Sequence, residues 1–125
     1  MKAKELMVGD WVCLKDDTKY ELPLKVDGVL TNDISLESEG FLGGAEGLIR
    51  PIPITPKMLV RNGWKEAQYW HEYQDGKSMI QCCLPDMRGR INGIEIEHFK
   101  CEYVHQYQHL LRLCGLNELA DNFKI

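Results

Sequence analysis

The sequence predicts an α+β protein in which β-strands come first and helices come later. Residues 1–54 hold short runs of strand-forming residues separated by turn signals about every ten residues, a spacing typical of small antiparallel barrels and sandwiches. Residues 55–125 hold one helix signal near each end and a hairpin signal between them. We therefore expect a small SH3-like antiparallel β-barrel, followed by a short helix, a three-stranded antiparallel meander and a C-terminal amphipathic helix, with the two parts forming one compact unit.

The first part, residues 1–54, is expected to contain about four or five short strands. A Gly9-Asp10 turn precedes the first strand, and alternation of apolar and polar residues predicts further strands as far as residue 38. Pro23 lacks an N–H donor, so its strand should be an edge strand or should begin after the proline. The segment Gly40–Gly47 contains four glycines in eight residues, which predicts a loop or a distorted hairpin.

The second part, residues 55–125, begins with a short helix. Thr55-Pro56 is typical of a helix N-cap followed by proline at the first helical position, and Asn62-Gly63 predicts the end of that helix. Asp75-Gly76 is a strong hairpin signal, and the polar run at 85–90 predicts a second turn. These two turns predict a three-stranded meander over about residues 64–101.

Residues 103–114 form the helix with the clearest pattern. At 100° per residue, one half of the helical wheel is apolar and holds Tyr103, Val104, Tyr107, Leu110, Leu111, Leu113 and Cys114. The other half holds His105, Gln108, His109 and Arg112, which should face water. The pattern predicts an amphipathic helix that ends at Gly115 and covers one face of the meander.

Composition and charge narrow the class of protein. The chain has 125 residues, of which 44% are hydrophobic and 27% charged, values that exclude a disordered or fibrous protein. Fifteen Lys and Arg against nineteen Asp and Glu give a net charge of −4, which disfavours sequence-independent binding to nucleic acid. No apolar run predicts a membrane span or a signal peptide, and the five cysteines are an odd number, so we expect a cytoplasmic protein with free thiols.

Three motifs carry a resemblance to a known family. They are a Leu-x-x-Gly-Asp/Asn-x-Val element at 6–12, a Pro-Ile-Pro-Leu-Thr-like segment at 51–55 followed by Gly63-Trp64, and a Tyr-Val-His-Gln-x-Gln-x-Leu helix at 103–110 followed by Gly-x-x-Glu-Leu at 115–119. In these motifs the sequence resembles a family of small uncharacterised proteins from gut Bacteroides genomes and their prophages or mobile elements. The resemblance implies a phage- or mobile-element-associated accessory protein, and it implies no known activity or catalytic residue.

Other residue patterns suggest chemistry but lack the groups that the chemistry requires. His105 and His109 are four residues apart on one helical face, yet the paired Cys-x-x-Cys spacing of structural zinc sites is absent. Nothing near Cys82-Cys83 would lower a thiol pKa, and Gly40–Gly47 lacks the Gly-Lys-Ser/Thr ending of a phosphate-binding loop. We therefore expect no metal, no cofactor and no catalytic residue, and a protein that is not an enzyme.

The aromatic segment 64–73 is the best candidate for a binding site. Alternation places Trp64 and Trp70 on one face of a regular strand and Tyr69 and Tyr73 on the other. Either one face is a stacking platform or both faces are packed in the core. We expect a non-enzymatic binding or adaptor module for a protein or peptide, the alternative being a nucleic-acid-associated accessory protein that uses the aromatics and two arginines. The candidate residues are Trp64, Tyr69, Trp70, His71, Tyr73, Arg88 and Arg90.

Overall fold

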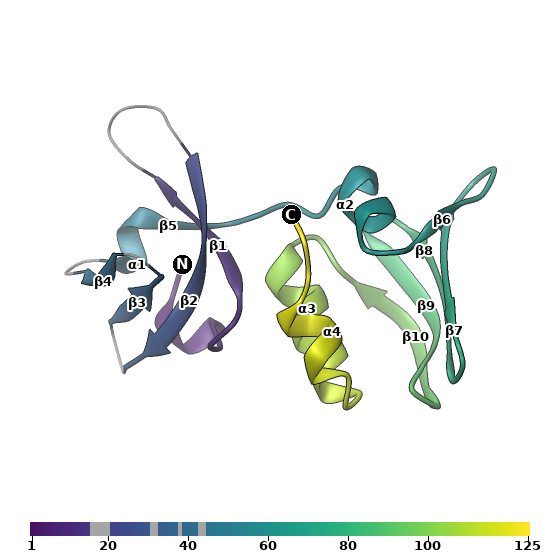
Figure 1. Cartoon of the computed structure of the whole chain (residues 1–125). Helices are drawn as coiled ribbons and strands as arrows, with labels where there is room; N and C mark the ends of the chain where they lie inside the picture. The colour runs from purple at the N-terminus through teal and green to yellow at the C-terminus, as the bar shows by residue number, and fades with distance from the viewer. Residues whose placement is uncertain (16–20, 31–32, 38, 43–44) are drawn as a thin grey trace. The chain divides into compact units, whose positions relative to one another are not determined.

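The computed structural model in Figure 1 describes residues 1–15, 21–30, 33–37, 39–42 and 45–125. The chain divides into two compact units, Met1–Ile52 and Pro53–Ile125. In the part of the chain that the structure describes, each unit has a five-stranded sheet in which neighbouring strands are antiparallel, together with short helices. This arrangement confirms the α+β class.

The described residues of unit 1 form a sheet with the strand order β4-β3-β2-β1-β5. Its elements are a 3₁₀-helix η1 (Ala3–Glu5), β1 (Trp11–Lys15), β2 (Glu21–Val29), β3 (Ile34–Leu36), β4 (Gly40–Leu42), α1 (Ala45–Leu48) and β5 (Ile49–Pro51). The predicted number of strands is confirmed, but the described strands form an open sheet and not a closed barrel, because no pairing joins β4 to β5. In the segment Gly40–Gly47, predicted as a loop or a distorted hairpin, the structure has strand β4, which pairs with β3, and the start of helix α1. Residues 43–44 lie outside the described part of the chain.

The predicted Gly9-Asp10 turn is present immediately before β1. Gly9 has a φ of 94°, the left-handed conformation that a four-residue turn of this kind needs at its third position. The buried Asp10 carboxylate accepts a hydrogen bond from the Met7 N–H at 2.8 Å, and the Asp10 N–H donates to the Met7 carbonyl. The carboxylate therefore satisfies a backbone donor of the turn from inside the fold.

Pro23 lies inside β2, opposite Cys13 of β1. The strand tolerates the proline because β3 pairs with β2 only from Val26 onward, so among the described strands β1 is the sole neighbour at this point. The register between β2 and β3 shifts between Val26 and Gly28, which marks a bulge where the strand turns from one partner to the other. Locally, then, Pro23 has the edge position that its missing N–H requires.

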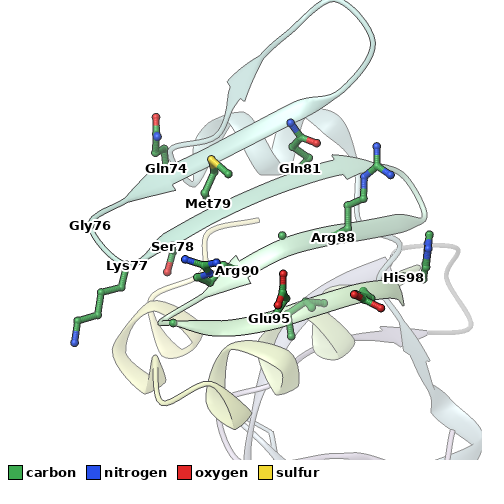
Figure 2. Close-up of a pocket in the computed structure, with 14 residues that line it drawn as sticks. Gln74, Gly76, Lys77, Ser78, Met79, Gln81, Arg88, Arg90, Glu95 and His98 are labelled. Carbon is green, nitrogen blue, oxygen red and sulfur yellow. The ribbon is translucent and has the colours of Figure 1, made fainter.

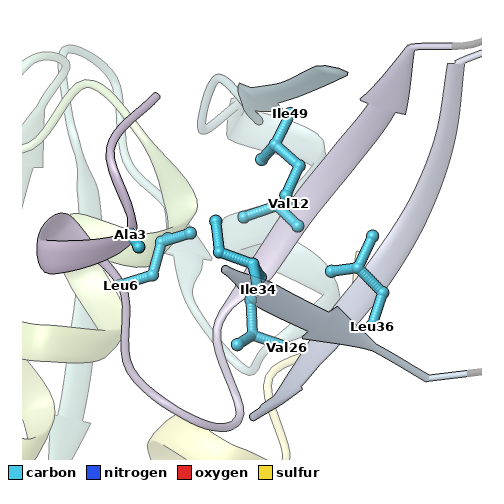
Figure 3. Packing of buried hydrophobic residues seen from close by; sticks show 7 residues of the cluster. All are labelled: Ala3, Leu6, Val12, Val26, Ile34, Leu36 and Ile49. Carbon is cyan, nitrogen blue, oxygen red and sulfur yellow. The ribbon is translucent and has the colours of Figure 1, made fainter. Parts of the chain in front are cut away.

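Aliphatic side chains from several strands form the core of unit 1 (Figure 3). The buried cluster consists of Ala3, Leu6, Val12, Val26, Ile34, Leu36 and Ile49. Each Val, Leu or Ile side chain removed from water contributes about 1.5–3 kcal/mol to stability. These buried residues come from the segment before β1 and from β1, β2, β3 and β5. Their packing therefore holds the sheet together around one apolar core.

Unit 2 contains a longer meander than the sequence predicted. Its elements are α2 (Pro56–Arg61), β6 (Lys65–Glu66), β7 (His71–Asp75), β8 (Ser78–Cys83), β9 (Asp86–Ile91), β10 (Ile94–Lys100), α3 (Val104–Leu113) and α4 (Asn117–Asp121). The strand order is β10-β9-β8-β7-β6, so the prediction of a three-stranded meander is wrong and the sheet has five strands.

Two chain reversals account for the additional strands. The Ala67 N–H donates to the Trp70 carbonyl at 2.8 Å, which turns the chain between β6 and β7. Asn92 and Gly93, with φ of 51° and 80°, join β9 to β10 as a two-residue hairpin turn of type I′. The predicted turn at 85–90 is also wrong in extent, since β9 already begins at Asp86.

Helix α2 has the predicted boundaries. The Thr55 hydroxyl accepts a hydrogen bond from the Met58 N–H at 3.3 Å, so Thr55 is the N-cap, and Pro56 is the first helical residue. At the other end, the Asn62 side-chain amide donates to the Met58 and Lys124 carbonyls, both at 2.7 Å, and its oxygen accepts from the Lys124 N–H at 2.8 Å. The C-cap residue therefore also holds a distant segment of the chain.

Helix α3 confirms the predicted helix, with Tyr103 as its N-cap. The Gln106 side-chain oxygen accepts hydrogen bonds from the Glu102 and Tyr103 N–H groups at 2.9 and 3.1 Å, which satisfies donors at the start of the helix. The assignment of its faces is wrong for Leu113, which is 78% exposed, and for Gln108 and His105, which are buried.

Helical geometry explains this difference. Gln108 lies about 60° around the wheel from the buried Leu111, whereas Leu113 lies about 160° from it. Helix α4 packs beside α3, and the Gln108 side-chain amide donates to the Ala120 carbonyl at 3.0 Å. The Arg112 guanidinium lies 3.2 Å from the Asp121 carboxylate on the same helix pair. Part of the predicted water-facing half of α3 is therefore covered by α4.

Candidate binding face

The sheet of unit 2 has two faces with different environments. Along β8 the side chains of Ser78, Ile80 and Cys82 are buried, whereas those of Met79 and Cys83 are exposed. Strand pairing extends this division across the sheet, because residues directly opposite each other lie on the same face. We call the outward face, which holds Glu72, Gln74, Met79, Gln81, Cys83, Asp86, Arg88, Arg90 and Glu95, the open face.

A broad hollow of about 840 Å³ lies on the open face (Figure 2). The arginines of β9 stand in the middle of this face, with Arg88 opposite Gln81 and Arg90 opposite Met79 on β8. On the other side of Arg90 lies Glu95 of β10, in direct register with it. The hollow thus combines basic, acidic, amide and apolar side chains, and it carries charges of both signs.

Met79 is an exposed apolar residue in the middle of this polar surface, and Ile96 also lines the hollow. Its side chain is 55% exposed and lines the hollow between Gln74 and Arg90, its two cross-strand neighbours. A single exposed methionine is ordinary on a protein surface, but its flexible thioether adapts well to different partners. Met79 therefore gives the open face one adaptable apolar contact point.

The candidate aromatic residues do not share a face. Tyr69 and Trp70 are exposed, at 73% and 36%, whereas Trp64 is only 3% exposed. The Trp70 indole N–H donates to the Glu72 carboxylate, which places Trp70 at the border of the open face. The expected alternation of Trp64 with Trp70 is wrong because the chain reverses between them, at 67–70.

The remaining aromatics lie on the covered side of the sheet. The Trp64 indole N–H donates to the Tyr107 hydroxyl of α3 at 3.3 Å. The centroids of the Trp64 and Tyr73 rings are 5.8 Å apart. His71 and Tyr73 are paired with Cys82 and Ile80, so they point to the same side as those buried residues. Burial raises the pKa of the Tyr107 phenol well above its usual value. Trp64 and Tyr73 therefore serve packing, and Tyr69 and Trp70 are the exposed residues among the candidate aromatics.

The two candidate arginines are brought together as expected, but on a strand and not on a turn. Both are exposed and belong to β9, with Gly89 between them. Gly89 has a φ of 137°, and a Cβ atom at this position would lie 2.1 Å from the Met79 carbonyl oxygen. Only glycine fits this close approach of β9 to β8, so Gly89 fixes where both arginine side chains stand.

Sequence reasoning missed Met79, Gln81 and Glu95 as parts of the same surface. The alternation of small or apolar with exposed residues in 78–83 carried the signal for the first two, because residues two apart share a face. Glu95 could be placed only after the Asn92-Gly93 turn had set the register of β10. The open face is thus a property of four paired strands and not of the aromatic segment alone.

The outer strand β10 completes the hollow on one side. Its pairing with β9 shifts between Ile96 and Phe99, and His98 has a φ of 52°. The His98 imidazole lies 3.6 Å from the Asp86 carboxylate, and both side chains are largely exposed. A bulge and charged residues make an edge strand a poor template for adding a further strand. The face of the sheet, rather than this edge, is the better candidate for binding.

The described cysteines and histidines support a reactive site less well than the open face supports a binding site. Burial raises the pKa of the Cys82 and Cys101 thiols to about 12, which keeps both protonated at neutral pH. The His105 and His109 rings meet edge to face, with centroids 5.6 Å apart. Within the described ranges, no group of three or more His, Cys, Asp or Glu residues is arranged to hold a metal ion.

Two further findings bear on the class of protein. None of the helices formed by the described residues is both long enough and apolar enough to cross a membrane. Comparison of the chain with protein-family models, with curated proteins and with solved structures finds no match.

Proposed function

We propose that this protein is a non-enzymatic binding or adaptor module whose open face takes an extended segment of a protein partner. The observation that carries the proposal is the hollow on the open face, where Met79 and two exposed arginines are presented together. Such a mixture of one apolar contact with charged groups is typical of surfaces that recognise protein segments rather than of packed cores.

The spacing of the charges supports an extended occupant. Arg88 and Arg90 are two residues apart on one strand and lie on the same face, so their backbones are separated by about 7 Å. Alternate residues of an extended peptide have the same separation. A segment with acidic side chains at alternate positions would match the two arginines, and a basic side chain beside them would match Glu95 on β10.

The alternative function is a nucleic-acid-associated accessory protein. The exposed Trp70 at the border of the face could stack on a base, and Arg88 and Arg90 could contact phosphates. The carboxylates of Glu72, Asp86 and Glu95 lie on the same face and would repel a phosphate backbone. Because charge of both signs fits a peptide better than a polyanion, the peptide is the preferred partner.

Two broader proposals accompany this one. The order β4-β3-β2-β1-β5, with a helical turn between the fourth and fifth strands, supports describing unit 1 as a relative of the SH3-like barrel. The resemblance of the three sequence motifs supports a cytoplasmic accessory protein linked to a prophage or mobile element of gut Bacteroides. Both proposals agree with an adaptor role, since small β-rich units commonly present surfaces to partners.

A peptide selection tests the proposed function. A display library of random dodecapeptides would be selected on the immobilised protein, and the affinities of recovered peptides measured by fluorescence anisotropy. We expect peptides with acidic residues at alternate positions, and at least about a tenfold loss of affinity for the double variant Arg88→Glu/Arg90→Glu, since like charges now meet. The matched control Lys57→Glu/Lys124→Glu carries the same change of charge at two exposed lysines, one in α2 and one after α4, that do not line the hollow, and it should bind as tightly as the unchanged protein.

Two outcomes would contradict the peptide proposal. In the first, no recovered peptide distinguishes the arginine variant from the lysine control. In the second, a fluorescein-labelled single-stranded DNA of mixed sequence binds instead, with an affinity that falls steeply with salt and is lost in the arginine variant. The second outcome would establish the alternative function.

A further inference from the structure

The hairpin turn between β9 and β10 forms hydrogen bonds with other segments of unit 2. Asn92 and Gly93 both have positive φ, and the turn sets the register in which Ile94 lies opposite Ile91. The Asn92 N–H donates to the Ser78 hydroxyl at 2.9 Å, and the Gly93 N–H donates to the Lys77 carbonyl at 3.1 Å. The turn is therefore fixed to the start of β8 as well as to its own strands.

The Asn92 side chain connects this turn to helix α3. Its amide Nδ2 donates to the Cys114 carbonyl, the C-cap of the helix, at 2.7 Å. Glycine suits the adjacent position 115, because its φ of 81° is strained for other residues and a Cβ atom there would lie only 3.2 Å from the same Nδ2. Asn92 thus supplies a donor to the end of the helix, where carbonyl groups lack helical partners.

We propose that Asn92 is a site of spontaneous deamidation whose reaction makes opening of the β9–β10 hairpin irreversible. The chemistry needs only the chain and water. The Gly93 backbone nitrogen attacks Cγ of Asn92, a C–N bond forms, the Cγ–Nδ2 bond breaks, and the proton of the Gly93 N–H leaves with the amine as ammonia. Water then opens the resulting succinimide at either carbonyl, giving an aspartyl residue at position 92 or its isoaspartyl isomer.

In the folded turn, hydrogen bonds prevent both groups from reacting. The attacking Gly93 nitrogen is engaged with the Lys77 carbonyl, and the departing Asn92 amide is engaged with the Cys114 carbonyl. Both hydrogen bonds must break before the nitrogen can reach Cγ. The rate of modification should therefore follow the fraction of molecules in which the hairpin is open.

The products cannot restore the original structure. The aspartyl product replaces the amide donor by a carboxylate that faces the Cys114 carbonyl at the negative end of the α3 dipole. The isoaspartyl product adds a methylene to the backbone of a two-residue turn, which changes the register of β10 against β9. That register places Glu95 beside Arg90, so the modification would also alter the open face.

The first experiment follows deamidation by peptide mass spectrometry at mildly alkaline pH, with the protein folded in buffer or unfolded in urea. In urea, Asn92 and Asn62, which both precede glycine, should convert at similar rates, whereas Asn117 and Asn122 precede bulkier residues and should convert far more slowly. In buffer, we expect conversion at Asn92 to be at least about tenfold slower than in urea, since only open molecules react. Equal rates at Asn92 in both solutions, or no conversion there in urea, would overturn the proposal.

The second experiment compares two variants that cannot undergo the reaction. Asn92→Gly keeps the positive φ and removes the amide without adding charge, whereas Asn92→Asp represents the deamidated product. At neutral pH we expect Asn92→Asp to melt at a temperature on the order of 2–8 °C below Asn92→Gly, with the difference closing as acid protonates the carboxylate. Equal melting temperatures at neutral pH would show that the carboxylate does no harm and would overturn the claim that the aspartyl product prevents the hairpin from closing again.

Discussion

Neighbouring residues of β8 share one backbone and yet face two different environments. Ile80 and Cys82 are each 1% exposed, whereas Met79 between Ser78 and Ile80 is 55% exposed. The covered face is apolar and meets α3, and the open face mixes charges, amides and one thioether. Helix α3 therefore packs on the apolar face of the sheet, and the other face remains accessible to water or to a partner.

Removal of a large side chain from α3 should give the largest loss of stability. Leu111 is completely buried, so Leu111→Ala should lower the free energy of unfolding by about 2–5 kcal/mol through lost burial and a residual cavity. Urea melts followed by circular dichroism would measure the loss.

The same helix offers a matched control for this change. Leu113 is 78% exposed, so Leu113→Ala removes the same atoms from solvent and should cost less than about 0.5 kcal/mol. Equal losses for the two variants would mean that the side of α3 that covers the sheet has been assigned wrongly.

The adjacent thiols of β8 should differ strongly in reactivity. Burial raises the pKa of Cys82 to about 12, whereas Cys83 is exposed on the other face. Because the thiolate is the reactive form, iodoacetamide at mildly alkaline pH should label Cys82 at least about a hundredfold more slowly than Cys83 in the folded protein, as measured by peptide mass spectrometry. In urea the two rates should converge, and a persistent difference there would point to local sequence as the cause.

The raised thiol pKa values also predict the direction in which alkaline pH changes the stability of the fold. The Cys82 and Cys101 pKa values rise from 9.0 to about 12 on folding, so the folded state keeps protons that the unfolded state releases. Their contribution to stability is complete below pH 9.0 and is lost as the pH rises towards 12. The variant Cys82→Ala should therefore lose less stability than the unchanged protein as the pH rises from 9.0 towards 12.

Truncation of the central residue on the open face should have the smallest effect on the fold. Met79→Ala should change the free energy of unfolding by less than about 0.5 kcal/mol, because the side chain is mostly in water already. Ile80→Ala, one residue further along, should cost about 2–5 kcal/mol by the mechanism described for Leu111. A large loss for Met79→Ala in urea melts would show that the open face is covered in solution.

Local signals account for the parts of the fold that the sequence predicts. Thr55-Pro56 and Asn62-Gly63 fix the ends of α2, and helical periodicity locates α3, because each signal acts within a few residues. The turn at 67–70 has no Gly, Pro, Asn or Asp, so the reversal there depends on pairing between β6 and β7 and was not predicted. The Asn92-Gly93 pair is itself a hairpin signal, and the turn that it forms separates β9 from β10 inside the region predicted as a three-stranded meander.

The candidate site shows the same division between local and long-range information. Arg88 and Arg90 could be proposed from the sequence, because charged residues near a turn are expected to reach solvent. Their companions come from β8 and β10, and only the register of three strands places Gln81 and Glu95 beside them. The face predicted for Trp64 is wrong for a similar reason, because its side chain contacts Tyr107, a residue far from it in the chain.

Gly89 gives a way to separate folding from binding when natural or laboratory variants of this chain are compared. Its close approach to the Met79 carbonyl excludes every side chain, whatever partner the protein has. Variants that fold should therefore keep glycine at this position, while the residues on either side are free to change with the partner. A variant that has lost both arginines but retains Gly89 would record a change of ligand on an unchanged scaffold.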